Sequence, residues 1–266
     1  MRFPAFLATV FVALTISGAT LPAVTITDAQ ALSAGRKLWK NECDGTVDGL
    51  TSWNSGEDFA SLGIGHYIWY PAGRRGPFAE SFPELLRFLT VEKVALPGWL
   101  QQATACPWNS REEFLRDHRG ERQVALREML ARTVALQARF SADRLQAALP
   151  KMLDESPAGQ RAKIKQQFDR VAQSPNGVYA LVDYVNFKGE GVLPTERYKG
   201  QGWGLLQVLA GMTGDPASGP GAQATHEFST AAARVLTERV ANSPTERGES
   251  RWLPGWKSRV RTYAAD

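Results

Sequence analysis

The feature that most constrains this chain of 266 residues is a series of helical patterns from residue 81 to residue 241. In each segment the apolar residues recur at steps of three and four, which places them on one face of an α-helix. Ser110 followed by Glu113 is a capping box, which is typical of a helix N-terminus. We therefore predict a mostly α fold. The expected helices cover residues 81–90, 109–118, 121–138, 142–155, 159–173, 178–187, 203–212 and 222–241.

A short segment near the N-terminal end departs from this pattern. After a helical run over residues 29–43, two strand-like runs cover residues 50–53 and 59–62. Asn54-Ser55-Gly56 lies between them, and these residue types are typical of tight turns. Residues 67–70 could extend the sheet as a further strand. The sequence thus predicts one small β-hairpin in an otherwise helical fold.

The first 23 residues have the pattern of a secretory signal peptide. Arg2 is followed by an apolar run and by small residues that offer cleavage after Ala19 or Ala23. No later segment is apolar for long enough to cross a bilayer, so we expect no stable membrane insertion after cleavage. The mature chain, residues 24–266, is expected to be periplasmic or secreted.

The mature chain has a length that suits a single domain with two lobes. We expect a hairpin lobe over about residues 29–75 and a helical lobe over about residues 76–266. The formal net charge of the whole chain is +4, and no basic cluster rises above the background. Nucleic acid is therefore not an expected partner.

The mature chain contains two cysteines, Cys43 and Cys106. In an oxidising compartment a disulfide between them is expected, and it would also fix the end of the helix that carries Glu42. Two unpaired buried thiols are the alternative.

Glu42 is the best candidate for a catalytic acid. It lies in the last turn of the predicted helix 29–43, near Trp39, and faces a hairpin flanked by Trp53. Cleavage of a glycosidic bond needs an acid that protonates the leaving oxygen and a group that stabilises an oxocarbenium-like centre. Partial burial among apolar groups raises the pKa of a carboxyl and keeps its proton available near neutral pH. The alternative is an ordinary exposed glutamate near a helix end.

The segment Ser61-Leu-Gly-Ile-Gly-His66 would form the far arm of the hairpin. Gly63 and Gly65 allow the strand to bend and bring its backbone close to a ligand or to the helix. Ser61 could hold a water on the face opposite the acid, and His66 could fix the acid or the hairpin by a hydrogen bond. The alternative is a structural histidine in a glycine-rich strand.

An acid at a helix end, a hairpin and then Thr/Ser-x-Gly-x-Gly-His together resemble the active-site segment of the phage-type lysozymes. The match covers about residues 29–70. The resemblance implies a lysozyme-like two-lobed helical fold, with Glu42 as general acid and Ser61 as the counterpart of the family's threonine. The family's catalytic aspartate falls on Ser55 in this chain. Glu57 or Asp58 could take its place.

If neither carboxylate points into the cleft, a single acid remains. A lone acid/base glutamate resembles the lytic transglycosylases, in which the sugar's own hydroxyl attacks and an anhydro end forms. Gly204-Leu-Leu-Gln207 is also similar to the Gly-Leu-Met-Gln of those enzymes, although it follows Glu42 by 165 residues. Hydrolysis and transglycosylation therefore both stay open.

Several polar and aromatic residues are candidates for sugar contacts. Asn186 and Gln207 are polar groups amid apolar helices, although Gln207 could instead cap a backbone group at a helix crossing. Flat tryptophan faces stack on the apolar faces of sugars, although most tryptophans simply fill cores. The predicted substrate contacts are His66, Trp53, Trp69, Asn186, Trp203 and Gln207.

These patterns favour a secreted glycosidase that acts on peptidoglycan or a related amino-sugar polymer such as chitosan. The alternative is a non-catalytic periplasmic protein that binds wall glycan or a partner on the same scaffold. No metal or other cofactor is implied, because His66, His118 and His226 are scattered without helical i, i+4 spacing. A serine hydrolase is disfavoured, since the chain has no Gly-x-Ser-x-Gly elbow.

Overall fold

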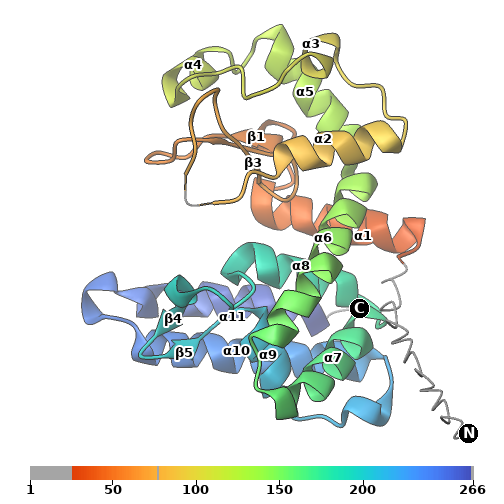
Figure 1. The fold of residues 1–266 in the computed structure, drawn as a ribbon, viewed down its shortest axis with the longest axis vertical. Coiled ribbons are helices and arrows are strands. Elements are labelled where there is room, and N and C mark those ends of the chain that lie inside the picture. Colours follow the sequence, from red (N-terminus) through yellow and green to blue (C-terminus); the bar gives the residue numbers. More distant parts are fainter. Residues whose placement is uncertain (1–25, 77, 265–266) are drawn as a thin grey trace, which may run out of the picture.

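The computed structural model describes residues 26–76 and 78–264, so the predicted signal peptide lies outside the described residues. The chain is mostly helical, as predicted, with a small antiparallel sheet near the front (Figure 1). The helices are α1 (Asp28–Cys43), α2 (Phe82–Val91), α3 (Gly98–Gln101), α4 (Arg111–Arg116), α5 (Glu121–Arg132), α6 (Val134–Asp154), α7 (Ala158–Ala172), α8 (Gly177–Lys188), α9 (Leu205–Gly211), α10 (Ala222–Asn242) and α11 (Leu253–Arg261).

The strands form two small sheets. β1 (Thr51–Ser52), β2 (Ala60–Leu62) and β3 (Tyr67–Trp69) are antiparallel in the order β1-β2-β3, so the predicted hairpin and its third strand are confirmed. β4 (Arg197–Tyr198) and β5 (Gln201–Gly202) make a second hairpin. The prediction of only one hairpin is therefore wrong. These strands have two residues each, which is too short for an alternating pattern to reveal.

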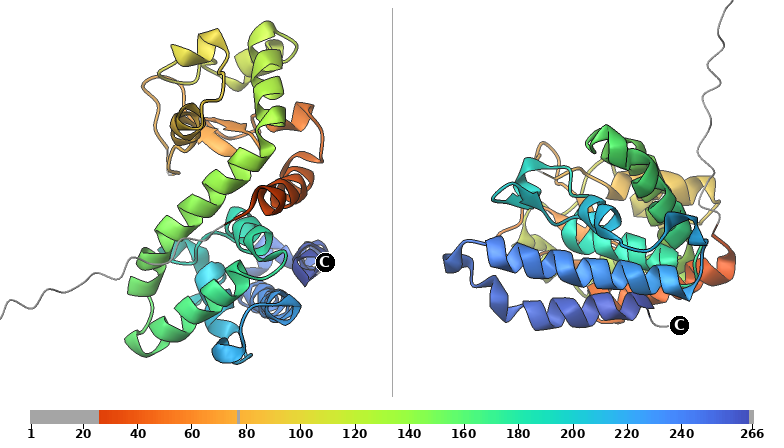
Figure 2. Two further views of the ribbon diagram at one scale, coloured as in Figure 1. Left: turned by 90° about the vertical axis from the view of Figure 1, so that its right-hand side faces the viewer. Right: turned by 90° about the horizontal axis from the view of Figure 1, so that it is seen from below.

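The elements lie along the length of the molecule in three groups. The three-stranded sheet and α2 to α5 lie at one end, and α7 to α11 lie at the other (Figure 1). α6 runs from the middle of the molecule to the end formed by the C-terminal helices, with α1 packed beside it (Figures 1 and 2). α8 packs against α1, α6, α7 and α9, so it lies between the middle of the molecule and the C-terminal helices.

Two helical boundaries differ from the prediction. The expected helix 121–138 ends at Arg132, and α6 continues through residues 138–142, where a break was expected. The Thr133 hydroxyl donates to Met129 O at 2.8 Å, and the Gln137 amide donates to Leu130 O at 2.7 Å. These side chains satisfy the carbonyls that the end of α5 leaves unpaired. α11 was not expected at all, because Pro254 and Gly255 lie in it, but proline is tolerated in the first turn of a helix.

α1 places its C-terminal end at the sheet. Thr27 and Gln30 form a capping box at its start, and Asp44 in the left-handed conformation ends it. Ala31 and Leu38 are buried on the face that packs toward α6. Glu42 therefore lies in the last turn of a helix that is fixed at both ends. No helix within residues 26–76 and 78–264 has the length and apolar character needed to span a membrane.

Candidate functional site

A groove of about 380 Å³ opens beside the end of α1. One wall comes from the sheet segment 65–68 and from Phe78, and α6 and α8 supply the others. The lining is partly apolar, since it includes Leu145, Val182 and Val185, and partly polar. The residues that give it its chemistry are Glu42, His66, Phe78, Ser141, Arg144, Asn186 and Glu190.

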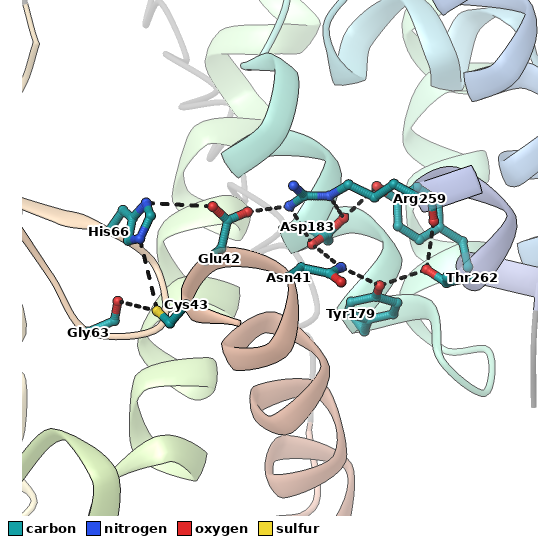
Figure 3. A network of polar contacts seen from close by, with 10 residues as sticks. Asn41, Glu42, Cys43, Gly63, His66, Tyr179, Asp183, Arg259 and Thr262 are labelled. Carbon is teal, nitrogen blue, oxygen red and sulfur yellow. Dashed lines mark hydrogen bonds and ion pairs between the residues drawn. The ribbon is translucent and has the colours of Figure 1, made fainter. Parts of the chain in front are cut away.

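Glu42 lies in this groove as the sequence predicts. Its side chain is 14 % exposed, and its Oε2 lies 3.6 Å from His66 Nδ1. Its Oε1 accepts a hydrogen bond from Arg259 Nη2, which comes from α11 (Figure 3). The carboxyl thus lies between a histidine of the sheet and an arginine of the last described helix.

Arg259 is shared with a second carboxylate, Asp183 of α8 (Figure 3). Arg259 Nε and Nη2 reach the two Asp183 oxygens at 2.9 and 2.8 Å. Tyr263 Oη donates to Asp183 Oδ2 at 2.6 Å, and Asn41 Nδ2 donates to Oδ1 at 3.0 Å. Asp183 is fully buried, and four donors occupy its two oxygens, which is close to the capacity of a carboxylate.

The electrostatics of this network centre on Arg259. Burial alone would lower the pKa of the Arg259 guanidinium, but the hydrogen bonds and negative charges of Asp183 and Glu42 raise it overall. The guanidinium is therefore a permanent cation. Glu42 and Asp183 share this one cation.

The Gly-x-Gly-His segment is a tight turn whose backbone packs against α6. Gly63 has φ +72°, and a Cβ at this residue would come within 2.4 Å of Gln137 Oε1. The same Gln137 oxygen accepts from Ile64 N at 3.0 Å. His66 also has a positive φ of 47°, which aims its ring at Glu42 and Cys43. These contacts explain the glycines and give His66 a place at the groove.

The expected disulfide between Cys43 and Cys106 is not formed, and both cysteines are free and buried. The Cys43 thiol lies 3.6 Å from Gly63 O and 3.9 Å from His66 Nε2. Cys106 lies elsewhere, where its backbone N–H donates to Tyr70 O at 3.0 Å. Cys43 lies near His66, and His66 lies near Glu42. Burial nevertheless raises the pKa of the Cys43 thiol to about 12. A thiol with that pKa is a poor nucleophile at neutral pH.

The hairpin residues expected on the opposite face of the substrate do not reach the groove within the described part of the chain. Ser61 is buried between β1 and β3, opposite Ser52 and Ile68. Asp58 is exposed and lies 3.8 Å from Arg74. Glu57 lies in the turn before β2 and does not line the groove. The assignment of these three residues to the groove is therefore wrong.

The three tryptophans expected at the sugar are also buried. Trp53 packs edge-on against Phe114, and Trp69 stacks on Trp99. Trp203 is buried beneath Arg239, whose guanidinium lies 4.1 Å from the ring centroid. Large rings fill cores because their burial removes much apolar surface from water. Two aromatic residues line the groove, the buried Tyr67 and Phe78, which is 58 % exposed.

The two polar candidates from the C-terminal half differ from each other. Asn186 lines the groove, as predicted. Gln207 does not, and the alternative reading of a backbone cap is confirmed. Its Oε1 accepts from Gly204 N at 2.9 Å, and its Nε2 donates to Gly191 O at 3.0 Å.

Sequence reasoning missed four groups that matter for this site. Arg259 and Asp183 hold Glu42, and Arg144 and Glu190 line the groove. An aspartate on an otherwise apolar helix was a usable signal for Asp183, because a buried carboxylate needs a cationic partner. Within residues 26–76 and 78–264, no group of three or more histidine, cysteine, aspartate or glutamate side chains has the arrangement of a metal site.

Comparison of the chain with protein-family models, with curated proteins and with solved structures gives no match. The site is therefore interpreted from its own geometry.

Proposed function

We propose that this protein cleaves the glycan strands of peptidoglycan, or of a related amino-sugar polymer, with Glu42 as general acid. The observation that carries this proposal is the position of Glu42 at the end of α1, in a groove, between His66 and the Arg259–Asp183 pair.

The charge balance around Glu42 supports the role of an acid. Arg259 donates two hydrogen bonds to Asp183, so Glu42 shares the positive charge of Arg259 with a second carboxylate. Protonation of Glu42 leaves the network electrically neutral, with one carboxylate and one guanidinium. A general acid at this position would give its proton to a glycosidic oxygen bound in the groove.

The arrangement of the molecule also supports a lysozyme-like two-lobed fold with the groove between the lobes. In this proposal the sheet and α2 to α5 form one lobe and α7 to α11 form the other, so the first lobe extends beyond the hairpin lobe of about residues 29–75 that the sequence suggests. Arg259 of the second lobe contacts Glu42, which stands at the edge of the first. A secreted or periplasmic location, which the leader predicts, would place such an enzyme where its substrate is.

A second candidate function is non-catalytic binding of wall glycan or of a partner. The ion pair of Glu42 with Arg259 favours it, because a structural carboxylate is expected to be paired. The displacement of Glu57, Asp58 and Ser61 from the groove favours it as well. Under this reading the groove binds sugar but leaves the glycosidic bond intact.

The test is to incubate the purified mature protein and its Glu42→Gln variant with peptidoglycan and to identify soluble products by mass spectrometry. Product from the wild type but not from Glu42→Gln is the expected result. The end group separates the two reactions, since hydrolysis gives a reducing end and transglycosylation an anhydro end. Glu128→Gln on the exposed side of α5 is the control. No product from either protein, on peptidoglycan or chitosan, would favour the binding function.

A further inference from the structure

Glu190 is a carboxylate that lines the groove but was not among the catalytic residues predicted from the sequence. It lines the same groove as Glu42 but follows the end of α8 rather than belonging to the sheet. Its side chain is 30 % exposed, so it is accessible to a ligand without being free in solvent. Lys151 Nζ of α6 lies 4.0 Å from Glu190 Oε2.

The backbone that carries Glu190 is held on both sides. Gly189 and Gly191 have φ of +83° and +84°, a conformation that only glycine adopts readily, so the chain turns sharply at Glu190. Leu205 N donates to Gly189 O and Leu206 N donates to Glu190 O, each at 3.0 Å. The start of α9 thus fixes this turn through main-chain hydrogen bonds.

The Gly-Leu-Leu-Gln segment adds further support to the same turn. Gln207 donates to Gly191 O, and a Cβ at Gly204 would lie 2.1 Å from Gly191 N, so Gly204 allows the close approach. Glu196 Oε2 also accepts from Gly191 N at 2.8 Å. A residue on a turn with so many contacts has a fixed position, which is what a catalytic group requires.

We propose that Glu190 is the second carboxylate of the reaction and acts as the general base that activates water. Glu42 lies at the end of α1 and Glu190 follows the end of α8, so two carboxyl groups from different elements line one groove. Inverting glycosidases use a pair of this kind, with one carboxyl as acid and the other activating a water on the opposite face of the sugar. This proposal rests on the proposed function of the groove.

The reaction balances with these two groups alone. As the bond between the anomeric carbon and the leaving oxygen breaks, Glu42 gives its proton to that oxygen. Water attacks the anomeric carbon from the side of Glu190, and Glu190 takes the proton that this water loses. Glu42 ends ionised and Glu190 ends protonated, and exchange with solvent restores both. The products carry a new reducing end with the oxygen of water.

The experiment compares wild type, Glu190→Gln, Glu190→Asp and the control Glu128→Gln on peptidoglycan in ¹⁸O-labelled water. The wild type and the control are expected to give reducing ends that contain ¹⁸O. Glu190→Gln is expected to lose hydrolysis by roughly 100-fold or more, as removal of a general base does. Glu190→Asp keeps a carboxylate and is expected to retain more activity than Glu190→Gln. In Glu190→Ala, added azide is expected to restore cleavage by replacing the water.

Two results would overturn this role for Glu190. One is a Glu190→Gln variant with the wild-type rate while Glu42→Gln is inactive, which would leave the proposed function intact. The other is a wild type that forms only anhydro ends, because no water is then consumed. No cleavage by the wild type would overturn the proposed function and the role of Glu190 with it. Equal melting temperatures of the variants would show that lost activity is not lost folding.

Discussion

Glu42 and Asp58 are both acidic residues beside the small sheet, but their ion pairs have very different surroundings. The Glu42–Arg259 pair is mostly buried and is joined to the fully buried Asp183. The Asp58–Arg74 pair lies at 3.8 Å, with the two side chains 78 % and 50 % exposed. Exposed pairs contribute little because water and salt screen them, whereas a buried carboxylate depends on its partners. The comparison teaches that the carboxyls of the groove are held by residues distant in sequence, and those of the hairpin turn are not.

The largest expected difference is in catalysis. Glu42→Gln removes the proton donor and should lower cleavage of peptidoglycan by about 10²- to 10⁴-fold. Glu57→Gln and Asp58→Asn remove carboxylates outside the groove and should keep rates within about twofold of wild type. Initial rates of release of soluble glycan measure all three. Equal losses in the three variants would place the catalytic carboxyl pair back in the hairpin.

The next expected difference is in stability. Asp183→Asn would direct an amide N–H₂ at Arg259 or Tyr263, which both donate to Asp183, and would leave the buried guanidinium with Glu42 alone. Breaking a buried pair in this way costs about 3–5 kcal/mol. The same substitution in the exposed pair, Asp58→Asn, should leave the free energy of unfolding nearly unchanged. Urea unfolding followed by circular dichroism measures both, and coincident midpoints would contradict the comparison.

A pH experiment tests how carboxylate partners affect the pKa of a buried cation. Arg259 and Lys188 both lie against the Phe187 ring, but Lys188 Nζ lies 3.4 Å from the Trp256 centroid and has no carboxylate at ion-pair distance among the described residues. Burial, followed by the charge of Arg239, lowers the pKa of Lys188 to about 7, although Glu249 opposes this shift.

The sign of the pH dependence follows from these pKa values. Between pH 7 and about pH 10 the unfolded chain binds a proton at Lys188 that the folded protein does not. The contribution of Lys188 to the free energy of unfolding should therefore rise with pH in this window, by up to about 1.4 kcal/mol per unit. Lys188→Met should lack that rise, so its stability relative to wild type should be highest near pH 7. A difference that does not change with pH would contradict the shifted pKa.

The smallest expected effect concerns Phe78. Phe78→Ala removes the exposed ring of the groove and should weaken binding of glycan fragments to Glu42→Gln by about tenfold or less. Val91→Ala changes an exposed apolar side chain of α2 outside the groove and should leave binding unchanged. Isothermal titration calorimetry with soluble glycan oligomers measures both. Equal affinities of the two variants would exclude Phe78 from sugar contact.

The local parts of the fold could be predicted from the sequence. The end of α1 at Glu42, the turn at 54–56 and the third strand depend on contacts between neighbours in the chain, which leave a readable pattern. The break at Thr133 was placed wrongly because the side chains that decide it, Thr133 and Gln137, look ordinary in an amphipathic helix.

The candidate site could be predicted only in part, for the same reason. Glu42, His66 and Asn186 reach the groove as expected. Arg259 was missed, since its role depends on the docking of α11 and leaves no trace in local spacing. The buried tryptophans were misassigned, because an aromatic ring carries no mark in sequence that separates a core position from a sugar-stacking one.

The position of Arg259 near the end of the described residues also determines when, during synthesis, the contacts of Glu42 are complete. Arg259 follows Glu42 by 217 residues, so the ribosome has made nearly all the described chain before the two can meet. A nascent chain in which α1 and the three-stranded sheet have already folded still lacks Arg259, the cation that pairs with Glu42. We therefore expect the newly made protein to remain inert toward glycan until its last described helix has docked.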